Sequence, residues 1–229
     1  KGRRLLSVSR EAVSRMFSLG WAYRTTSDDK YLKRGEEEML AIAEFSDWNP
    51  SHFLDVAEMT MAMGVGYDWL FNGLSNDSKK IIRNAIVKKG INESLTGRGN
   101  WWIDSVTNWN QVCHGGITCG TLAVMEDVPD LAEKIIHRSV NKVQIAMEQY
   151  EPHGAYPEGP GYWGYGTTYN VLLIAALDSA LETDFGLSEK PGFIKSAEYY
   201  MHATGPTGLF FNYSDSGKRS GYIPTLSWF

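Results

Sequence analysis

Apolar residues recur at three- and four-residue spacing along almost the whole chain, which is the periodicity of amphipathic α-helices. One such series is Leu54, Ala57, Met61, Val65 and Trp69. Strand-like alternation of apolar and polar residues is scarce. Helix start signals accompany the series; Ser75, for example, precedes a polar first turn and is a favourable N-cap residue. The sequence therefore predicts an all-α protein.

The same pattern places the individual helices. They are expected at about residues 7–25, 28–46, 51–71, 76–93, 106–126, 129–150, 163–183 and 191–203. A long helix followed by a short turn, repeated along a chain, is typical of the antiparallel hairpins of an α/α toroid or an α-solenoid. No Pro/Ser-rich linker divides the sequence. We therefore expect one domain over residues 1–229, an incomplete α/α toroid around a central cleft.

Composition and charge exclude several classes of protein. The 229 residues are 43% hydrophobic and 21% charged, which is the balance of a folded globular chain. Apolar stretches such as Val171–Ala176 are far shorter than the roughly 20 residues of a membrane span. A formal net charge of −5 disfavours nucleic acid as a partner. Cys113 and Cys119 cannot build a disulfide framework, and a spacing of six turns them to different helix faces.

Sequence motifs for common cofactor chemistry are missing. The chain has no Gly-x-Ser-x-Gly elbow, zinc-binding His-Glu-x-x-His, Cys-x-x-Cys pair or phosphate loop. The glycine-rich residues 154–166 do not follow a predicted strand, which argues against a dinucleotide fingerprint. No two histidines form a helical pair with a third ligand nearby. We expect neither a cofactor nor a metal.

The first polar cluster lies in residues 107–116. Asn110 and His114 are four residues apart, so on a helix they share a face and both could address one ligand atom. The structural alternative makes Asn110 the end of a loop and His114 a hydrogen-bonded core residue against the small Gly115 and Gly116. The spacing leaves both interpretations open.

Two further segments carry candidate chemistry. Residues 156–166 alternate tyrosine and tryptophan with glycine, which lets a backbone approach a ligand while phenols exchange protons. The alternative is a rigid aromatic turn at the start of the next helix. Asn49 and His52 stand at the start of another predicted helix. There Asn49 is a natural turn residue, and His52 is as readily an exposed residue of the first turn as a ligand.

Together these segments resemble the helical domain of the heparinase II/III-like polysaccharide lyases. The matching motifs are His52–Glu58 with Gly66–Leu70, then Asn108–Gly116, then Tyr156–Gly166. They occur in the family's order, and the likeness extends from about residue 40 to the end of the chain. Three ordered motifs are far more specific than any one of them.

The resemblance implies a function and a location. Family members hold an acidic polysaccharide in an α/α toroid and cleave it beside a uronic acid by β-elimination. Asn110 matches the residue that neutralises the uronate carboxylate, with Asn108 as a credible substitute, and Tyr165 matches the catalytic tyrosine. His114 is expected to assist Asn110. The resemblance further implies a periplasmic or secreted protein. Its β-sandwich domains, which supply another catalytic histidine, would follow this chain.

Around that centre we expect aromatic platforms, one local positive charge and additional polar contacts. These substrate-binding candidates are Trp101, Trp102, Trp109 and Trp163, Arg98, and Asn49, His52, Asn108, Glu158 and Tyr162. The chain starts at Lys1 without Met and stops just after an apolar stretch, so we expect a piece of a longer polypeptide.

Two alternatives to a lyase stay open. A glycoside hydrolase would use a carboxylate pair such as Glu158 and Asp68. A non-catalytic carbohydrate-binding domain would keep the tryptophans without needing Tyr165. The clustering of tyrosines and amides favours the lyase over the hydrolase. The identity of the uronate polymer, endo or exo action and the oligomeric state depend on geometry that the sequence does not contain.

Overall fold

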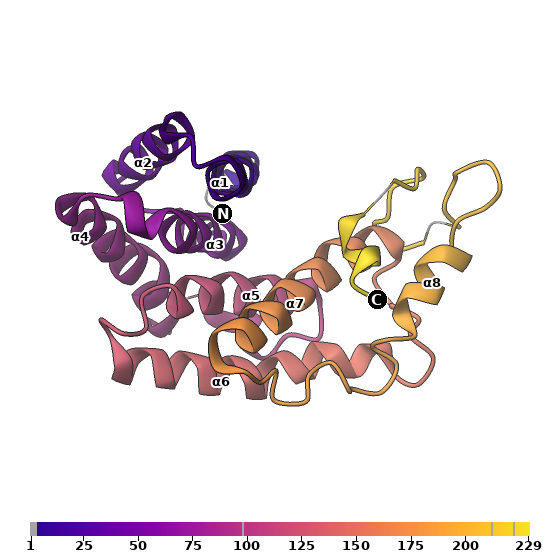
Figure 1. Cartoon of the computed structure of the whole chain (residues 1–229). Coiled ribbons are helices and arrows are strands. Elements are labelled where there is room, and N and C mark those ends of the chain that lie inside the picture. The colour runs from indigo at the N-terminus through magenta and orange to yellow at the C-terminus, as the bar shows by residue number, and fades with distance from the viewer. Residues whose placement is uncertain (1–3, 98, 212, 222) are drawn as a thin grey trace. The chain divides into compact units, whose positions relative to one another are not determined.

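The computed structural model describes residues 4–97, 99–211, 213–221 and 223–229 (Figure 1). Its α-helices are α1 (Leu6–Thr26), α2 (Asp29–Glu44), α3 (Phe53–Leu70), α4 (Asn76–Ala85), α5 (Asn108–Leu122), α6 (Pro129–Met147), α7 (Pro160–Leu181) and α8 (Ser196–His202). Over these described ranges β-structure is limited to two isolated bridges, Thr204 with Phe210 and Leu209 with Arg219. The predicted all-α class is confirmed.

Short helical turns join or extend these helices. They are η1 (Phe71–Gly73), the π-helical turn η2 (Ile86–Ile91), η3 (Asn92–Leu95), η4 (Asn100–Asp104), η5 (Glu148–Tyr150) and η6 (Pro224–Ser227). The helix predicted over residues 76–93 is therefore regular only to Ala85 and continues as η2 and η3. The helix predicted from residue 163 begins earlier, at Pro160, because proline is well suited to the first helical turn.

Local sequence explains several helix ends. The Asp28 carboxylate accepts a hydrogen bond from the backbone N–H of Lys30 at 3.0 Å and so caps α2. Ser75, the expected N-cap residue, accepts one from Ser78 at 3.1 Å and caps α4. The chain leaves α1 at Ser27 and α7 at Glu182 in the left-handed conformation, with φ of 55° and 57°, which is a common way to end a helix.

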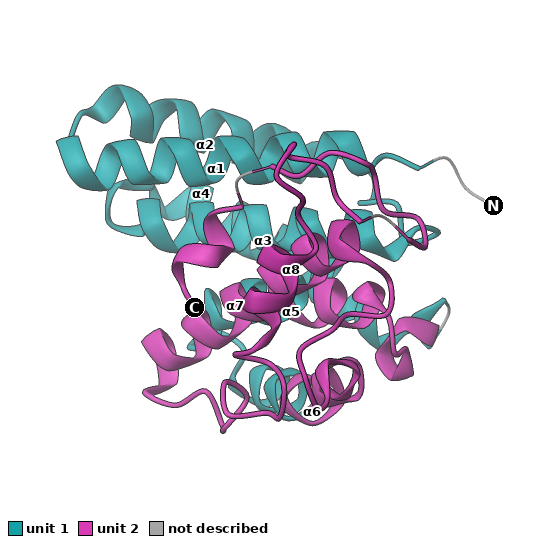
Figure 2. Cartoon of the chain, turned by 90° about the vertical axis from the view of Figure 1, so that its right-hand side faces the viewer, with its two compact units in different colours: residues 1–100, 116–137 teal, residues 101–115, 138–229 magenta. Residues whose placement is uncertain are grey.

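The chain forms two compact units (Figure 2). Unit 1 contains residues 1–100 and 116–137, and unit 2 contains residues 101–115 and 138–229. Helices α5 and α6 each contribute residues to both units. The expectation of a single domain stays a prediction.

In unit 1, α3 is the central helix and is buried on almost every side. A Cβ on Gly20 of α1 would lie 2.8 Å from the Trp69 ring, and one on Gly66 of α3 would lie 2.8 Å from the sulfur of Met16. These contacts show that α1 and α3 run in the same direction, with glycines allowing their close approach. Arg15 of α1 pairs with Glu38 of α2, as expected for an antiparallel hairpin.

The second half of α5 also packs on α3 within unit 1. Gly116 lies against the backbone carbonyl of Ala57, and a Cβ on Gly64 would come within 2.7 Å of the Gly120 Cα. Residue numbers increase together along both helices, so α3 and α5 are parallel. All four contact positions are glycine or alanine because only small residues permit so close a crossing.

In unit 2, the first half of α5 contacts α6 and α7. The Asn110 amide donates to the backbone carbonyl of Lys142, and His114 lies beside Ser139, which makes α5 and α6 antiparallel. Gly166 of α7 lies against Gln111, and a Cβ on Gly115 would come within 2.8 Å of the Tyr169 carbonyl oxygen. Helices α5 and α7 therefore run parallel.

Both units follow one rule: odd-numbered helices pack parallel to each other, and α2 or α6 returns antiparallel to its odd-numbered predecessor. This agrees with the predicted antiparallel hairpins, while closure into a toroid stays a prediction. Within the described ranges, none of the helices combines the length and the apolar character that crossing a bilayer demands.

Candidate functional site

Most of the predicted site residues belong to unit 2. They are Trp101, Trp102, Asn108, Trp109, Asn110, His114, Glu158, Tyr162, Trp163 and Tyr165. Asn49 and His52 belong to unit 1, and Arg98 lies outside the described residues. The structure therefore allows the site to be built in unit 2, from η4, the start of α5, the 151–159 loop and the start of α7.

The Glu158 carboxylate caps the start of α5. Its Oε2 accepts the backbone N–H of Asn108 at 2.6 Å, and its Oε1 accepts the Asn108 side-chain amide at 2.9 Å. The Tyr156 hydroxyl lies 3.0 Å from Oε2 and shares its single hydrogen between this oxygen and Gln111 Oε1. A negative charge at a helix N-terminus is stabilised by the free N–H groups and the helix dipole. Glu158 thus joins its loop to a helix fifty residues earlier in the sequence.

A buried chain of hydrogen bonds continues from this carboxylate to α7. The Tyr156 hydroxyl also lies 2.9 Å from Gln111 Oε1, and the Gln111 amide donates to the Tyr150 hydroxyl at 2.7 Å. That hydroxyl is 2.7 Å from Thr167 Oγ1 on α7. Burial raises the pKa of the Tyr150 and Tyr156 phenols well above 10, so both stay protonated. These tyrosines hold the site together and do not supply a base.

The start of α7 is held by the C-terminal loop. Gly159 precedes the helix with φ of 86°, a conformation that favours glycine, and the Ser216 hydroxyl accepts the backbone N–H of Gly161 at 3.0 Å. Nearby, the Tyr213 hydroxyl donates to the Tyr156 carbonyl at 2.6 Å. The first turn of α7 therefore receives its N-terminal cap from a residue fifty-five positions away.

Two tyrosines of this first part of α7 reach the surface. Tyr162 and Tyr165 are both partly exposed. The Tyr165 ring lies edge-on to Tyr169, with 5.7 Å between ring centroids and 84° between ring planes. Gly166, the next residue, fits against Gln111 and Asn108 of α5. The backbone of Tyr165 is therefore adjacent to the start of α5.

The four tryptophans predicted as platforms divide into two pairs. Trp101 is 58% exposed, and its ring centroid lies 4.8 Å from that of the partly exposed Trp109. Trp102 and Trp163 have no exposed surface, and they contact His114 and Tyr200 respectively. The structure places Trp102 and Trp163 in the core of unit 2, where neither ring can stack on a sugar.

Asn110 and His114 do share one face of α5, as expected, but both are fully buried. The Asn110 amide nitrogen donates to the carbonyls of Ile103 at 2.8 Å and Lys142 at 3.0 Å. The His114 ring nitrogens lie 3.2 Å from Ser139 Oγ and 3.4 Å from the Ile103 carbonyl. Burial, and then the charge of Arg138, lower the pKa of His114 to about 3, so the ring is neutral. His114 is therefore a hydrogen-bonded core residue, which is the alternative to a ligand-binding histidine that the sequence left open.

This arrangement leaves Asn110 no hydrogen to offer a uronate without breaking an existing bond, since both amide hydrogens go to backbone carbonyls. Asn110 and His114 converge on the Ile103 carbonyl in η4. Trp101 belongs to the same turn. The pair therefore fixes the turn that carries the exposed indole.

Asn49 and His52 form hydrogen bonds with a buried carboxylate in unit 1. Asp55 is 2% exposed and accepts hydrogen bonds from the Asn49 amide at 2.6 Å and the backbone N–H of Leu5 at 2.8 Å. His52 Nδ1 lies 2.8 Å from its other oxygen. Asn49 has φ of 60°, in keeping with the turn predicted at this position. Asp55, which both predicted residues hold, thus fastens the residue before α1 to α3.

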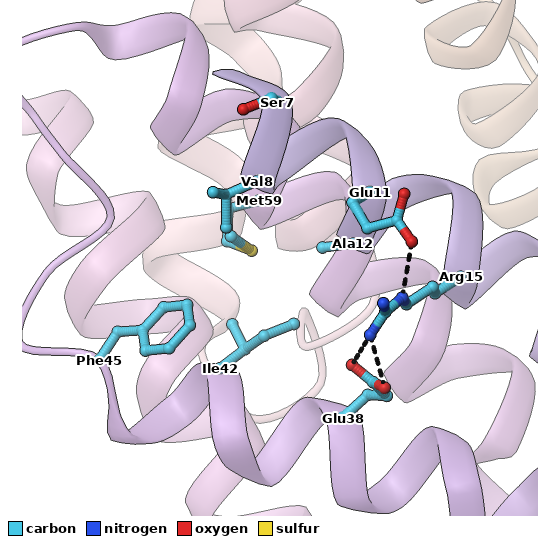
Figure 3. A pocket seen from close by; sticks show the side chains of 9 residues that line it. All are labelled: Ser7, Val8, Glu11, Ala12, Arg15, Glu38, Ile42, Phe45 and Met59. Carbon is cyan, nitrogen blue, oxygen red and sulfur yellow. Dashed lines mark hydrogen bonds and ion pairs between the residues drawn. The ribbon is translucent and has the colours of Figure 1, made fainter. Parts of the chain in front are cut away.

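Unit 1 also contains a hollow of about 460 Å³ beside α1 and α2 (Figure 3). Val8, Ile42, Phe45 and Met59 line its apolar part, and Arg15 lies at one end. The Arg15 guanidinium bonds to Glu11 at 2.9 Å and to Glu38 at 2.8 Å. Since these carboxylates neutralise the cation and no predicted site residue lines the hollow, it does not match a uronate site.

Sequence reasoning missed three residues that build the site in unit 2. Gln111 is one turn after Asn108, so helical spacing could have linked the two. Tyr156 is the first residue of the aromatic segment but was not named as a site residue. Ser216 gave no signal, because its partner is fixed only by the path of the C-terminal loop. In the described ranges, no group of three His, Cys, Asp or Glu side chains is placed to hold a metal ion.

Comparison with known protein families finds no matching family, and comparison with curated proteins finds no matching sequence.

Proposed function

We propose that unit 2 binds an acidic polysaccharide and that the protein cleaves it by β-elimination beside a uronic acid. The observation that carries this proposal is the exposed Trp101, whose ring lies tilted by 41° against that of Trp109 at the start of α5, in the same unit as the partly exposed Tyr162 and Tyr165. Aromatic faces bind the apolar face of a sugar ring, and a phenol can transfer the protons of an elimination.

Tyr165 is the proposed acid and base. As phenolate, it removes the proton from C5 of the uronate, and the electrons of that C–H bond form a double bond between C4 and C5. The bond from C4 to the glycosidic oxygen breaks with its electron pair, and the proton passes from Tyr165 to this oxygen. The phenolate is restored, so one residue completes the cycle.

Asn110 and His114 enter the proposal as positioning residues. They hold the Ile103 carbonyl, and so the η4 turn with Trp101, while a direct contact with the uronate carboxylate would cost Asn110 a backbone hydrogen bond. The hydrolase alternative receives less support. Both oxygens of Glu158, which it would use for catalysis, already accept hydrogen bonds from Asn108.

The proposal is tested by incubating the chain with a panel of heparan sulfate, chondroitin and alginate. Elimination creates a conjugated unsaturated uronate, so ultraviolet absorbance rises, and binding quenches the fluorescence of Trp101 and Trp109. Reducing ends that appear without the absorbance would replace the lyase by a hydrolase. Binding without either product would replace it by a carbohydrate-binding domain. The absence of binding to every polymer would overturn the proposed site.

A further inference from the structure

The Glu158 carboxylate joins two elements of the proposed site in unit 2, the 151–159 loop and the start of α5. The backbone N–H and side-chain amide of Asn108 donate to it at 2.6 and 2.9 Å, and the Tyr156 hydroxyl, at 3.0 Å, shares its one hydrogen between this carboxylate and Gln111. Asn108 is almost completely buried, whereas Glu158 is partly exposed. From exposure alone the carboxylate could be a substrate ligand, but both of its oxygens are directed at the protein.

The contacts of Glu158 connect the two helix starts of the site. Through Asn108 it fixes the first residue of α5, which Trp109 follows directly. Through Tyr156, Gln111 and Tyr150, the chain of hydrogen bonds reaches Thr167, two residues after Tyr165. The carboxylate therefore lies at one end of a network that relates Trp109 on α5 to Tyr165 on α7.

We propose that Glu158 is the positioning residue of this site: its charge caps α5 and sets the placement of Trp109 relative to Tyr165, and it does not bind the substrate. The part of this inference that concerns the polysaccharide rests on the proposed function. The cap itself is a property of the protein and is tested without any carbohydrate.

Two substitutions can reverse the direction of the side-chain hydrogen bond between Asn108 and Glu158. In Asn108→Asp alone, two carboxylates face each other and repel. In the double variant Asn108→Asp with Glu158→Gln, the new glutamine amide donates to the new aspartate, and the glutamine oxygen still accepts the backbone N–H of residue 108. Every hydrogen bond of the pair is then replaced, although position 158 has lost its carboxylate.

Glu158→Gln alone is expected to disturb the cap of α5 less than Asn108→Asp does. The buried Asn108 Oδ1 has no hydrogen-bond partner among the described residues. The Asn108 amide can therefore turn over and accept from the glutamine. The order of the amide exchange rates in the three variants therefore identifies this contact.

The experiment compares the native chain, Asn108→Asp, Glu158→Gln and the double variant, with Glu189→Gln on the exposed surface of unit 2 as the matched charge control. Amide hydrogen exchange in the first turn of α5 reports the cap, and kcat and KM on the cleaved polysaccharide report the site. We expect exchange at least about tenfold faster in Asn108→Asp, restored to within about threefold of the native value in the double variant. We expect kcat to fall and recover in parallel, with the control unchanged.

A double variant no better than Asn108→Asp in exchange would overturn the cap. Restored exchange with kcat/KM still lost would show that the Glu158 carboxylate contacts the substrate, and would overturn the positioning role. If Asn108→Asp does not fold, recovery of folding in the double variant is the rescue, and failure to recover contradicts the proposal. If the native chain neither binds nor cleaves a polysaccharide, the proposed function fails while the exchange data still decide the cap.

Discussion

The imidazole of His114 lies edge-on to the indole of Trp102, with 4.9 Å between ring centroids and 71° between ring planes. The Arg138 guanidinium lies 5.5 Å from the centroid of the same indole. Both rings are fully buried. Burial removes the water that would stabilise a charged imidazole, and the nearby Arg138 cation disfavours that charge further, which explains the low pKa of His114.

This pKa makes stability depend on pH in a definite direction. His114 has a pKa of about 3 in the folded protein and an ordinary value of 6.5, so below pH 6.5 the unfolded chain binds a proton that the folded protein does not. The contribution of His114 to stability is complete above pH 6.5 and is lost as the pH falls toward 3. We expect up to about 1.4 kcal/mol of unfolding free energy per pH unit from this group.

Denaturant unfolding between about pH 7 and pH 5 measures this slope. His114→Gln removes the titrating group and should flatten the dependence, while His202→Gln, at an exposed position of α8, should leave it as in the native chain. Equal slopes in all three proteins would contradict the buried neutral state of His114.

Trp101→Ala tests the aromatic surface. Because the indole is 58% exposed, its loss should change the melting temperature little, while polysaccharide affinity falls about two- to tenfold through lost stacking. Trp21→Ala, at a 65% exposed position of α1 in unit 1, is the matched control and should retain affinity. Titration followed by calorimetry compares them, and equal affinities would remove Trp101 from the site.

Tyr165→Phe tests the proposed chemistry. Removing the hydroxyl should lower the rate of unsaturated uronate formation by about 10²- to 10⁴-fold and leave binding almost unchanged, because only the proton-transferring group is lost. Tyr31→Phe, at a partly exposed position of α2 in unit 1, controls for the loss of a phenol and should keep the native rate. Native turnover in Tyr165→Phe would exclude this tyrosine from the mechanism.

Gly116→Ala tests the close crossing of α3 and α5 in unit 1. The added methyl group would collide with the backbone carbonyl of Ala57, which cannot move aside as a side chain can. We expect destabilisation of about 3 kcal/mol, measured by thermal or denaturant unfolding. Gly217→Ala is the control, since no atom lies within 4 Å of its added Cβ. A native-like melting temperature for Gly116→Ala would show that the helices are farther apart.

The helix positions could be predicted because they depend on local information. The 3.6-residue periodicity and residues such as Asp28 and Ser75 mark where helices run and begin. The chain is helical over the whole of the predicted residues 76–93, but it is α-helical only to Ala85, after which a π-helical turn follows. Periodicity does not distinguish an α-helix from a wider turn, since both keep apolar residues on one side.

The candidate site was predicted only in part. The structure places Asn108, Glu158 and the Tyr156–Gly166 segment next to one another within unit 2, while their part in a functional site stays a prediction. The sequence could not distinguish the exposed Trp101 from the buried Trp102, because adjacent residues of a short turn point in different directions and only the packing decides which is covered.

The sequence by itself determined the all-α class and the helix order, since periodicity and capping are local properties. The tertiary structure alone decided which polar residues face solvent and which hold the fold. His114 became a neutral core residue because packing removed its water, and Glu158 became the cap of α5 because its loop returned to a helix fifty residues away. Desolvation and long-range hydrogen bonding depend on contacts between distant residues, which no local pattern contains.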